Sequence, residues 1–324
     1  MAKNQINQII QIIKNLKNIA LIGHRDGDGD CYGALIGLYL ALEKIGKNVR
    51  IYSERELPES FQFLIENRQV KFIDNYWKKA DCLIIVDTSG RNIISIPEVA
   101  DKHLSDGDTA SILIDHHEKG ELVNHVNYAW VDQKYCSASE LALELVKGLK
   151  VNIDSEIATA LLTGIDTDTA SFQTQNTTSR AFASASYLMD RGAKLYDIVQ
   201  NNYFNHTIDS LRVRALVIDR LVINRKHGVA VSYLLNEDFN GASIEGASRM
   251  ISQANFLNTI KGVKMIIFMS EIELGTIRVS LRTRDHEVDV SQIAKTLGGG
   301  GHIKAAGFLF NGHMRVNNGR VEIV

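Results

Sequence analysis

The sequence predicts an α/β protein in two parts: a parallel-sheet N-terminal domain with covering helices, and a smaller α/β domain at the C-terminal end. Two observations support this prediction. In the first 115 or so residues, short apolar runs of strand length alternate with helical segments, as in parallel sheets whose strands are connected by helices. Beyond about residue 220, most apolar runs have strand length again. The chain has 324 residues, which suits two domains of roughly 100–200 residues each.

The N-terminal elements follow from hydrophobic periodicity. Isoleucines from Ile6 to Ile13 recur at helical spacing and predict a first amphipathic helix. The apolar run Ile19–Ile22 predicts a buried strand, and 32–45 predicts a helix that Gly46 closes. Further strands are expected at Val49–Tyr52, Cys82–Val86 and Ser111–Ile114, with helical stretches at 58–66 and 97–104. Residues from Ser139 to about 202 are mostly helical, with a polar interruption at 166–178.

The C-terminal part is expected to begin after a connecting helix at 207–219. We therefore predict a catalytic domain over 1–195, a connecting segment over 196–220 and a substrate-binding domain over 221–324. Strands are predicted at 221–224, 229–234, 263–269 and 277–282, and a helix at 290–297.

The amino-acid composition limits the functions that this protein can have. Hydrophobic residues make up 45% and charged residues 23%, which is typical of a globular protein. The formal net charge of −2 gives no signal for long nucleic acid, although a local basic pocket could still bind a short phosphorylated substrate. Three scattered cysteines have neither disulfide-framework nor zinc spacing, so we expect a cytoplasmic protein. No apolar run approaches the ~18 residues of a membrane span, so we expect no membrane contact.

Three predicted strands end in chemically active side chains. The first leads to His24, the second to Asp87 and the third to Asp115-His116-His117. Ligands bind at the carboxyl ends of the strands in open parallel sheets. This coincidence makes the carboxyl edge of the sheet the predicted site.

The loop after the first strand carries one imidazole and several carboxylates: His24, Asp26, Asp28 and Asp30. Its glycines allow it to fold back so that these groups converge. An acidic surface turn explains the loop alone equally well. A calcium loop of the EF-hand type does not, because Gly37 stands where the twelfth-position glutamate would fall.

The other clusters are individually ambiguous. Asp87 could be a helix cap or turn former, one of the two histidines at 116 and 117 could be structural, and Asp166 and Asp168 could form turns at a helix end. Together the clusters provide enough ligands for two adjacent divalent cations. Imidazole with carboxylates suits manganese, iron or zinc better than calcium.

The second domain carries a run of four glycines, 298–301, followed by His302. Such a run suits close approach of backbone N–H groups to an anion, although a flexible hinge is an alternative. Arg278 and Arg282 share one face of a predicted strand, and Arg282 is a candidate phosphate ligand; a solvated strand face is equally compatible.

These motifs, in this order, resemble the DHH phosphoesterase superfamily. The matching residues are H-x-x-x-D-x-D from His24 to Asp30, strand-end Asp87, Asp115-His116-His117, and D-T-x-x-F from Asp168 to Phe172. The V-S-L-R segment and the glycine run resemble the DHH-associated C-terminal domain. The length and the G-G-G-G-H ending are most similar to the nanoRNase and pAp-phosphatase branch, whose members trim very short RNAs and remove the 3′-phosphate of pAp.

The resemblance implies a role for each matched position. His24, Asp28 and Asp87 would hold one metal; Asp30, Asp87, His116 and Asp168 would hold the other, with Asp87 bridging and manganese as the expected metal. His117 would face the phosphate, and Asp115 would orient the histidines. The second domain would bind the rest of the substrate through these residues: Arg282, Gly299, Gly300, Gly301 and His302.

The resemblance also implies substrates and alternatives. The expected substrates are RNAs of about two to five nucleotides and pAp, and relatives suggest a homodimer. A linear or cyclic dinucleotide phosphodiesterase uses the same centre, and a nucleotide sensor or RNA-binding protein without turnover is an alternative of another class. The chain departs from the family in the Arg-Asp-Gly stretch before Asp28, where the family often has proline and this loop has the additional Asp26. It also departs at Ala34 and Ala170, where the family often has serine and glycine. None of these departures removes a predicted ligand.

Overall fold

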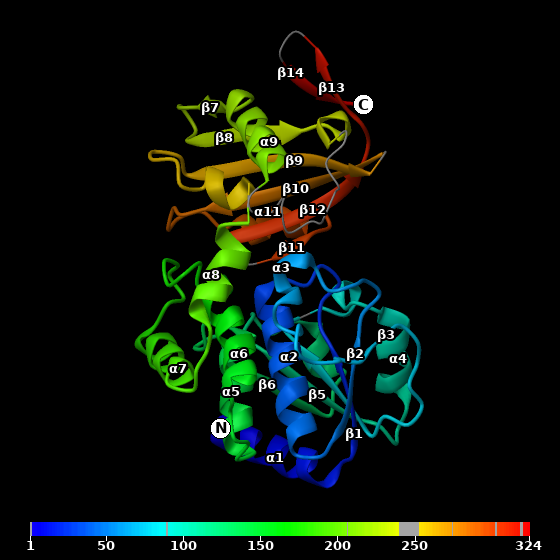
Figure 1. Ribbon diagram of the computed structural model, residues 1–324. Coiled ribbons are helices and arrows are strands. Elements are labelled where there is room, and N and C mark those ends of the chain that lie inside the picture. The colour runs from blue at the N-terminus through cyan, green and yellow to red at the C-terminus, as the bar shows by residue number, and fades with distance from the viewer. Residues whose placement is uncertain are drawn as a thin grey trace. The chain divides into compact units, whose positions relative to one another are not determined.

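The computed structural model describes residues 2–88, 90–205, 207–239, 253–273, 275–301, 303–317 and 320–324. The chain divides into two compact units, Met1–Asn205 and His206–Val324 (Figure 1). The first contains a parallel sheet with covering helices and the second a mixed sheet with helices. The predicted α/β fold class is therefore confirmed.

The sheet of the first unit has six parallel strands in the order β3-β2-β1-β4-β5-β6. The strands are β1 (Asn18–Ile22), β2 (Asn48–Tyr52), β3 (Phe72–Ile73), β4 (Cys82–Val86), β5 (Ala110–Asp115) and β6 (Tyr128–Val131). The strand order reverses between β1 and β4. A sheet of this kind opens a crevice at its carboxyl edge at that reversal, so the residues after β1 and β4 lie where a ligand is expected.

Helices cover both faces of this sheet (Figure 1). They are α1 (Ala2–Asn15), α2 (Gly29–Lys44), α3 (Glu59–Gln62), α4 (Pro97–Ser105), α5 (Ala138–Gly148), α6 (Ser155–Asp168), α7 (Ser179–Met189) and α8 (Leu195–Tyr203), with 3-10 turns at Arg91–Ile93 and Glu121–Asn124. Along β4, Ile84 packs into the larger core with α1, α2, α5 and α6, whereas Leu83 packs into a smaller core with α4. Both faces are buried, which explains the continuous apolar runs of these strands.

A close helix contact brings distant parts of the chain together. A Cβ atom added at Gly33 of α2 would lie 2.6 Å from the carbonyl oxygen of Ala160 in α6. One added at Gly164 of α6 would lie 2.6 Å from Asp30 Oδ1 and overlap Ser139 Oγ. The absence of side chains at these two positions lets α2 and α6 approach. The N-terminal turn of α2 and the C-terminal turn of α6 are thereby neighbours.

In the first unit, the structure adds two strands that the sequence analysis did not predict, β3 and β6. They form the two edges of the sheet. All of their residues except Trp130 are only partly buried, so neither shows the continuous apolar run of the central strands. The helical stretch predicted over 58–66 is helical only at Glu59–Gln62.

The second unit is built on a mixed sheet in the order β11-β12-β10-β9-β8-β7. Its strands are β7 (Val222–Asn224), β8 (Val229–Leu234), β9 (Met265–Glu273), β10 (Thr276–Thr283), β11 (Gly300–Gly301) and β12 (Ala305–Asn311), and β13 (Met314–Asn317) pairs with β14 (Arg320–Ile323). Helix α9 (Ile208–Asp219) shares one apolar core with β8 and β9, and α11 (Val290–Thr296) shares another with β10. Helix α9, predicted as a connecting segment, belongs to this unit.

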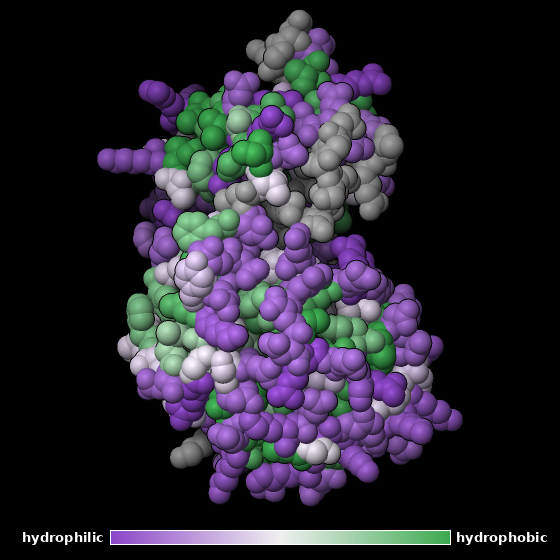
Figure 2. Space-filling view, in the orientation of Figure 1, coloured by the Kyte–Doolittle hydropathy of each residue, from purple (hydrophilic) through white to green (hydrophobic). Residues whose placement is uncertain are grey.

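The face drawn in Figure 2 is mostly hydrophilic on both units, with hydrophobic side chains in smaller groups. Among the described residues, every helix is too short or too polar to span a lipid bilayer.

A buried histidine should make stability depend on pH. His103 in α4 is fully buried, its Nε2 lies 2.8 Å from Tyr52 Oη, and burial lowers its pKa from the ordinary value of 6.5 although Asp106 opposes this. The folded protein then keeps His103 neutral at a pH where the unfolded chain takes up a proton. Below about pH 6.5 this residue should lower the free energy of unfolding, by up to ~1.4 kcal/mol per pH unit.

Chemical unfolding of the parent protein and of His103→Gln between about pH 7 and pH 5 measures this contribution. The loss of stability on acidification should be smaller in His103→Gln. Equal pH slopes in the two proteins would contradict the prediction.

Candidate metal centre

The acidic loop after β1 continues directly into the first turn of α2. Asp28 is the N-terminal cap of α2: its Oδ1 accepts hydrogen bonds from the backbone N–H groups of Asp30 and Cys31, at 3.0 and 3.1 Å. Asp is a favoured residue at this position because its carboxylate satisfies N–H groups that have no partner within the helix. The same carboxylate oxygen lies 3.9 Å from His24 Nε2. Capping thus holds Asp28 beside His24, which follows β1.

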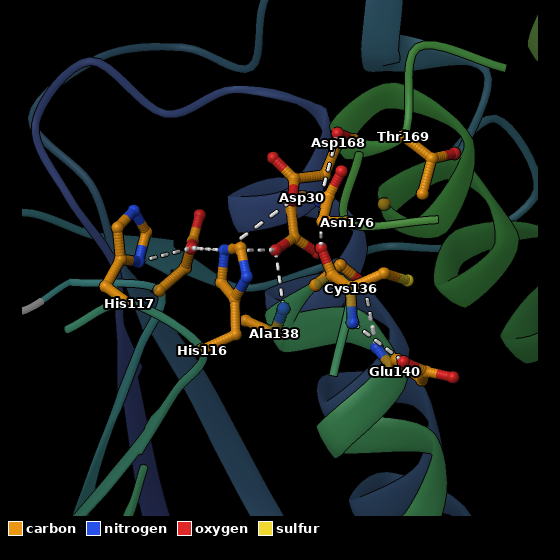
Figure 3. A network of polar contacts seen from close by, with 12 residues as sticks. Asp30, His116, His117, Cys136, Ala138, Glu140, Asp168, Thr169 and Asn176 are labelled. Carbon is orange, nitrogen blue, oxygen red and sulfur yellow. Dashed lines mark hydrogen bonds and ion pairs between the residues drawn. The ribbon is translucent and has the colours of Figure 1, made fainter. Parts of the chain in front are cut away.

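Asp30 is fixed by the N-terminus of another helix. Its two carboxylate oxygens accept hydrogen bonds from the backbone N–H groups of Ala138 and Ser139, at 2.6 and 2.8 Å, in the first turn of α5 (Figure 3). The positive end of a helix stabilises a carboxylate placed there. Asp30 is only 1% exposed.

Asp87 follows β4 in a left-handed backbone conformation, with φ 54°. Asp is one of the few non-glycine residues that adopts this region at small cost, and such strain often accompanies function. The side chain is 3% exposed, and its buried Oδ1 accepts no hydrogen bond among the described residues. Its Oδ2 lies 3.5 Å from His24 Nε2, while Oδ1 lies 3.6 Å from His116 Nε2. One carboxylate thus faces a histidine on each side.

The two adjacent histidines after β5 have different surroundings. Asp115 Oδ1 accepts a hydrogen bond from the backbone N–H of His117 and lies 2.7 Å from its Nδ1. This contact fixes the orientation of the His117 ring, whose Nδ1 is also 3.6 Å from Asp87 Oδ1. His116 points instead toward Asp30 and Asp168, with Nε2 3.8 Å from Asp30 Oδ2 and 3.7 Å from Asp168 Oδ2 (Figure 3).

The donor atoms fit cations between them. The facing histidine and carboxylate atoms lie 3.5–3.9 Å apart, beyond ordinary hydrogen-bond distance. Two ligands of a transition metal, each about 2.0–2.2 Å from the ion, are separated by a similar amount. Three sets of donor atoms each lie within 4.8 Å of one another: His24 with Cys31 and Asp87, Asp87 with His116 and His117, and Asp30 with His116 and Asp168. Together with the unsatisfied Asp87 oxygen, this donor set suits divalent cations that bind nitrogen and oxygen.

The electrostatics of these side chains also favour bound cations. Burial, together with the Asp87 and Asp168 carboxylates, raises the pKa of Asp30 well above its usual range. Burial also raises the pKa of Asp168 to about 6, although His116 opposes this. For His117, burial favours the neutral ring, but Asp115 outweighs it and raises the pKa to about 9. Several buried carboxylates that repel one another are stabilised when cations lie between them.

Three of the substrate residues predicted in the second unit, Arg282, Gly300 and Gly301, lie on its strands. Arg282 of β10 is partly exposed, and its Nε donates to Asn255 Oδ1 at 2.7 Å. Gly300 and Gly301 form β11 and pair with Gly307 and Ala306 of β12. A Cβ atom at Gly299 would overlap the Gly307 carbonyl oxygen, so close backbone packing alone requires glycine there. His302 lies outside the described residues.

Two carboxylates near the predicted ligands point elsewhere. Asp166 accepts a hydrogen bond from the Ser171 hydroxyl at 3.0 Å and is held by Tyr203 of α8. Asp26 forms an ion pair with Arg55 at 3.7 Å. Of the two carboxylates at the end of α6, it is Asp168 that faces His116.

Sequence reasoning missed two side chains. Cys31 follows Asp30 in the chain and lies with His24 and Asp87; only its place in the first motif could have drawn attention to it. Asn176 donates from Nδ2 to Asp168 Oδ2 at 3.0 Å and to the carbonyl oxygen of Cys136 at 2.9 Å (Figure 3). No sequence pattern distinguishes it from other loop asparagines.

Because Asn176 holds the Asp168 carboxylate, Asn176→Ala should weaken cation binding or turnover. Loss of a group that orients a metal ligand typically costs about 10–100-fold. Titration with Mn²⁺, followed by calorimetry, measures the effect. The control is Asn201→Ala, which removes an amide whose Nδ2 donates to the Asp197 carbonyl oxygen of its own helix. Equal affinities in both variants would show that Asn176 has no positioning role.

Comparison with known proteins places the chain in a class. Residues 18–165 match the DHH family, N-terminal domain, and residues 226–317 match the DHHA1 domain. Together with the fold, these matches define a phosphoesterase hydrolase. The chain carries a DHH-family N-terminal domain and a DHHA1 domain, so the resemblance inferred from its motifs is confirmed.

Two curated relatives and one solved structure show the range of similar proteins. The bifunctional oligoribonuclease and PAP phosphatase NrnA of Mycoplasma genitalium is 27% identical over 98% of this chain and 96% of its own length. The cyclic-di-AMP phosphodiesterase GdpP of Geobacillus thermodenitrificans is 28% identical over 89% of this chain, but only 44% of its own length. An exopolyphosphatase-related protein from Bacteroides fragilis shares the fold, with a TM-score of 0.83, 23% identity, and coverage of 94% of this chain and 90% of its own.

Proposed function

We propose that this enzyme is a two-metal phosphoesterase that hydrolyses very short RNAs to mononucleotides and removes the 3′-phosphate of pAp to give AMP. The observation that carries the proposal is the position of Asp87, a buried carboxylate that faces His24 with one oxygen and His116 with the other. This arrangement suits a bridging ligand between two cations. The Mycoplasma genitalium relative, named for both activities and matched over nearly its whole length, supports the substrate assignment.

The residues would divide between two cation sites. His24, Asp28 and Asp87 would hold one ion, and Asp30, Asp87, His116 and Asp168 the other, with Mn²⁺ as the expected ion. A pair of bound divalent cations supplies an activated water and stabilises charge on both the attacking and the leaving oxygen of a phosphoryl displacement.

The chain's own residues then orient the reaction. Asp115 fixes the orientation of the His117 ring. The imidazolium can therefore donate a hydrogen bond to a non-bridging phosphate oxygen without a prior change in its orientation. The first turn of α5 holds Asp30, and Asn176 holds Asp168, so two ligand carboxylates are positioned before substrate arrives. In the second unit, Arg282 would supply a charged contact to another phosphate of the substrate.

A second candidate is a linear or cyclic dinucleotide phosphodiesterase. The Geobacillus thermodenitrificans relative carries that activity in its name, but this chain spans less than half of that protein. A nucleotide-sensing or RNA-binding protein without turnover is the candidate of another class. The presence of every predicted ligand in this sequence favours turnover.

The test is product analysis with Mn²⁺ on four substrates: a labelled RNA pentamer, pAp, a linear diadenylate and cyclic di-AMP. Mononucleotides from the pentamer and AMP from pAp, at rates well above hydrolysis of cyclic di-AMP, support the proposal. Preferential hydrolysis of either dinucleotide favours the second candidate. Binding of these ligands without any turnover would favour the sensor.

A variant in the second unit tests the substrate contact. Arg282→Ala should raise KM for pAp more than it lowers kcat, because the contact binds a phosphate remote from the reacting one. Lys226→Ala, in the turn between β7 and β8, is the control for loss of one positive charge from the same unit. A homodimer, expected from the family resemblance, stays a prediction that sedimentation velocity can check.

A further inference from the structure

We propose that Cys31 is a thiolate ligand in the cation site formed by His24 and Asp87, which makes this site selective for thiophilic divalent cations such as Zn²⁺, Cd²⁺ and Co²⁺. The inference rests on the proposed two-metal centre and adds a ligand to it. It also makes the two cation sites chemically different.

The position of the thiol carries the first part of the argument. Cys31 lies in the first turn of α2, is 1% exposed, and its Sγ lies within 4.8 Å of both a His24 ring nitrogen and an Asp87 carboxylate oxygen. Gly23 leaves room for it, since a Cβ atom added there would overlap Sγ. The thiol therefore faces the carboxyl ends of β1 and β4, which His24 and Asp87 follow, as well as the hydrophobic core.

The neighbouring groups give an independent reason to expect an ion. Asp87 is 97% buried and has a left-handed backbone conformation. Its Oδ2 lies 3.5 Å from His24 Nε2, a distance that suits two ligands of one cation. A buried carboxylate is costly unless it is paired or binds a metal. Nitrogen, oxygen and sulfur donors that converge at one point form a ligand set typical of zinc.

The second site lacks sulfur in its donor set. Asp30, His116 and Asp168 offer only carboxylate oxygens and one imidazole nitrogen, which suits Mn²⁺. At the His24 site, the thiol must lose its proton to bind. The S–H bond breaks, the proton passes to solvent, and a bond forms between sulfur and the ion, with no change in oxidation state. A soft cation gains more from this bond than Mn²⁺ does.

The first readout is spectroscopic and needs no turnover. Full-length protein freed of metal is titrated with Co²⁺, and the near-ultraviolet charge-transfer absorption of a cobalt–thiolate bond is recorded. The parent protein should show this band, and Cys31→Ala and Cys31→Ser should lose it. Cys82→Ala is the matched control, because Cys82 is equally buried but lies at the end of β4 opposite to Asp87. The Cys82→Ala protein should keep the cobalt–thiolate band.

The second readout is selectivity. Cys31→Ala should weaken Cd²⁺ binding at least about tenfold, the lower bound seen when a metal site loses even an orienting group, while the Mn²⁺ affinity of the Asp30–His116–Asp168 site stays within about twofold. If one of the two variants, Cys31→Ala or Cys31→Ser, fails to fold, the other is sufficient for both readouts.

The outcomes separate this inference from the proposed function. Co²⁺ binding without the band, or a band that persists in the Cys31 variants, overturns the thiolate ligand but leaves the two-metal centre intact. A parent protein that binds neither Co²⁺ nor Mn²⁺ overturns the metal centre, and the thiolate ligand with it.

Discussion

Asp87→Asn should reduce kcat on pAp and on short RNA by at least about a thousandfold. Asp87 is the carboxylate that faces both proposed cation sites. A bound metal contributes several kcal/mol of transition-state stabilisation, and each 1.36 kcal/mol corresponds to a factor of ten. An amide of the same shape offers one neutral oxygen and a nitrogen that binds metals poorly. Steady-state kinetics at saturating Mn²⁺ measures the loss.

The same variant should not lose stability in the absence of metal. Burial raises the pKa of the Asp30 and Asp168 carboxyls, and the negative charge of Asp87 raises both further, because these carboxylates repel one another. Asparagine removes that repulsion and also tolerates the left-handed backbone at this position. We therefore expect the metal-free variant to unfold at the same or a higher temperature than the parent, a pattern typical of residues kept for function.

Asp81→Asn is the control for Asp87→Asn. Asp81 precedes the same strand at its other end, where Oδ2 accepts hydrogen bonds from the backbone N–H groups of Lys17 and Asn18. This substitution should lower stability and leave kcat nearly unchanged. If Asp87→Asn and Asp81→Asn had the same effect on kcat, Asp87 would have only a structural role.

Removal of divalent cations should abolish turnover completely and lower the stability of the first unit. Ligands that bind only the folded state stabilise it by about 2.7 kcal/mol at a concentration one hundred times Kd. Thermal unfolding of the parent should therefore shift upward with added Mn²⁺. The shift should be much smaller in Asp87→Asn, because that variant has lost the shared ligand.

Readdition experiments complete the chelation test. Mn²⁺ should restore turnover, whereas Ca²⁺ should not, since a site rich in imidazole suits transition metals better than calcium. Turnover that persists after exhaustive chelation would contradict a metal-dependent mechanism. An equal Mn²⁺ shift in Asp87→Asn would place the ions elsewhere in the protein.

The strands at the centre of the first sheet were predictable because they are buried on both faces. Cys82–Val86 was predicted with the bounds that β4 has, and β1, β2 and β5 differ by one residue at one end or at each end. Continuous apolar runs are strong signals. The edge strands β3 and β6 have half-buried residues that read as loop, so only pairing with β2 and β5 defines them.

The sequence by itself determined the fold class, the family and the side chains that meet at the carboxyl edge of the sheet. It did so because strand ends in a parallel sheet converge, so residues far apart in the chain, such as His24, Asp87 and His116, could be placed together from hydrophobic pattern alone.

Only the tertiary structure decided which neighbouring groups hold those side chains. The glycine contact between α2 and α6 brings Asp168, rather than Asp166, to His116. Packing of α5 delivers its N-terminal N–H groups to Asp30, and a loop asparagine, Asn176, reaches Asp168. The same packing turns Cys31 toward His24 and Asp87. These contacts depend on distances between elements that are remote in the chain, and no local pattern of residues encodes them.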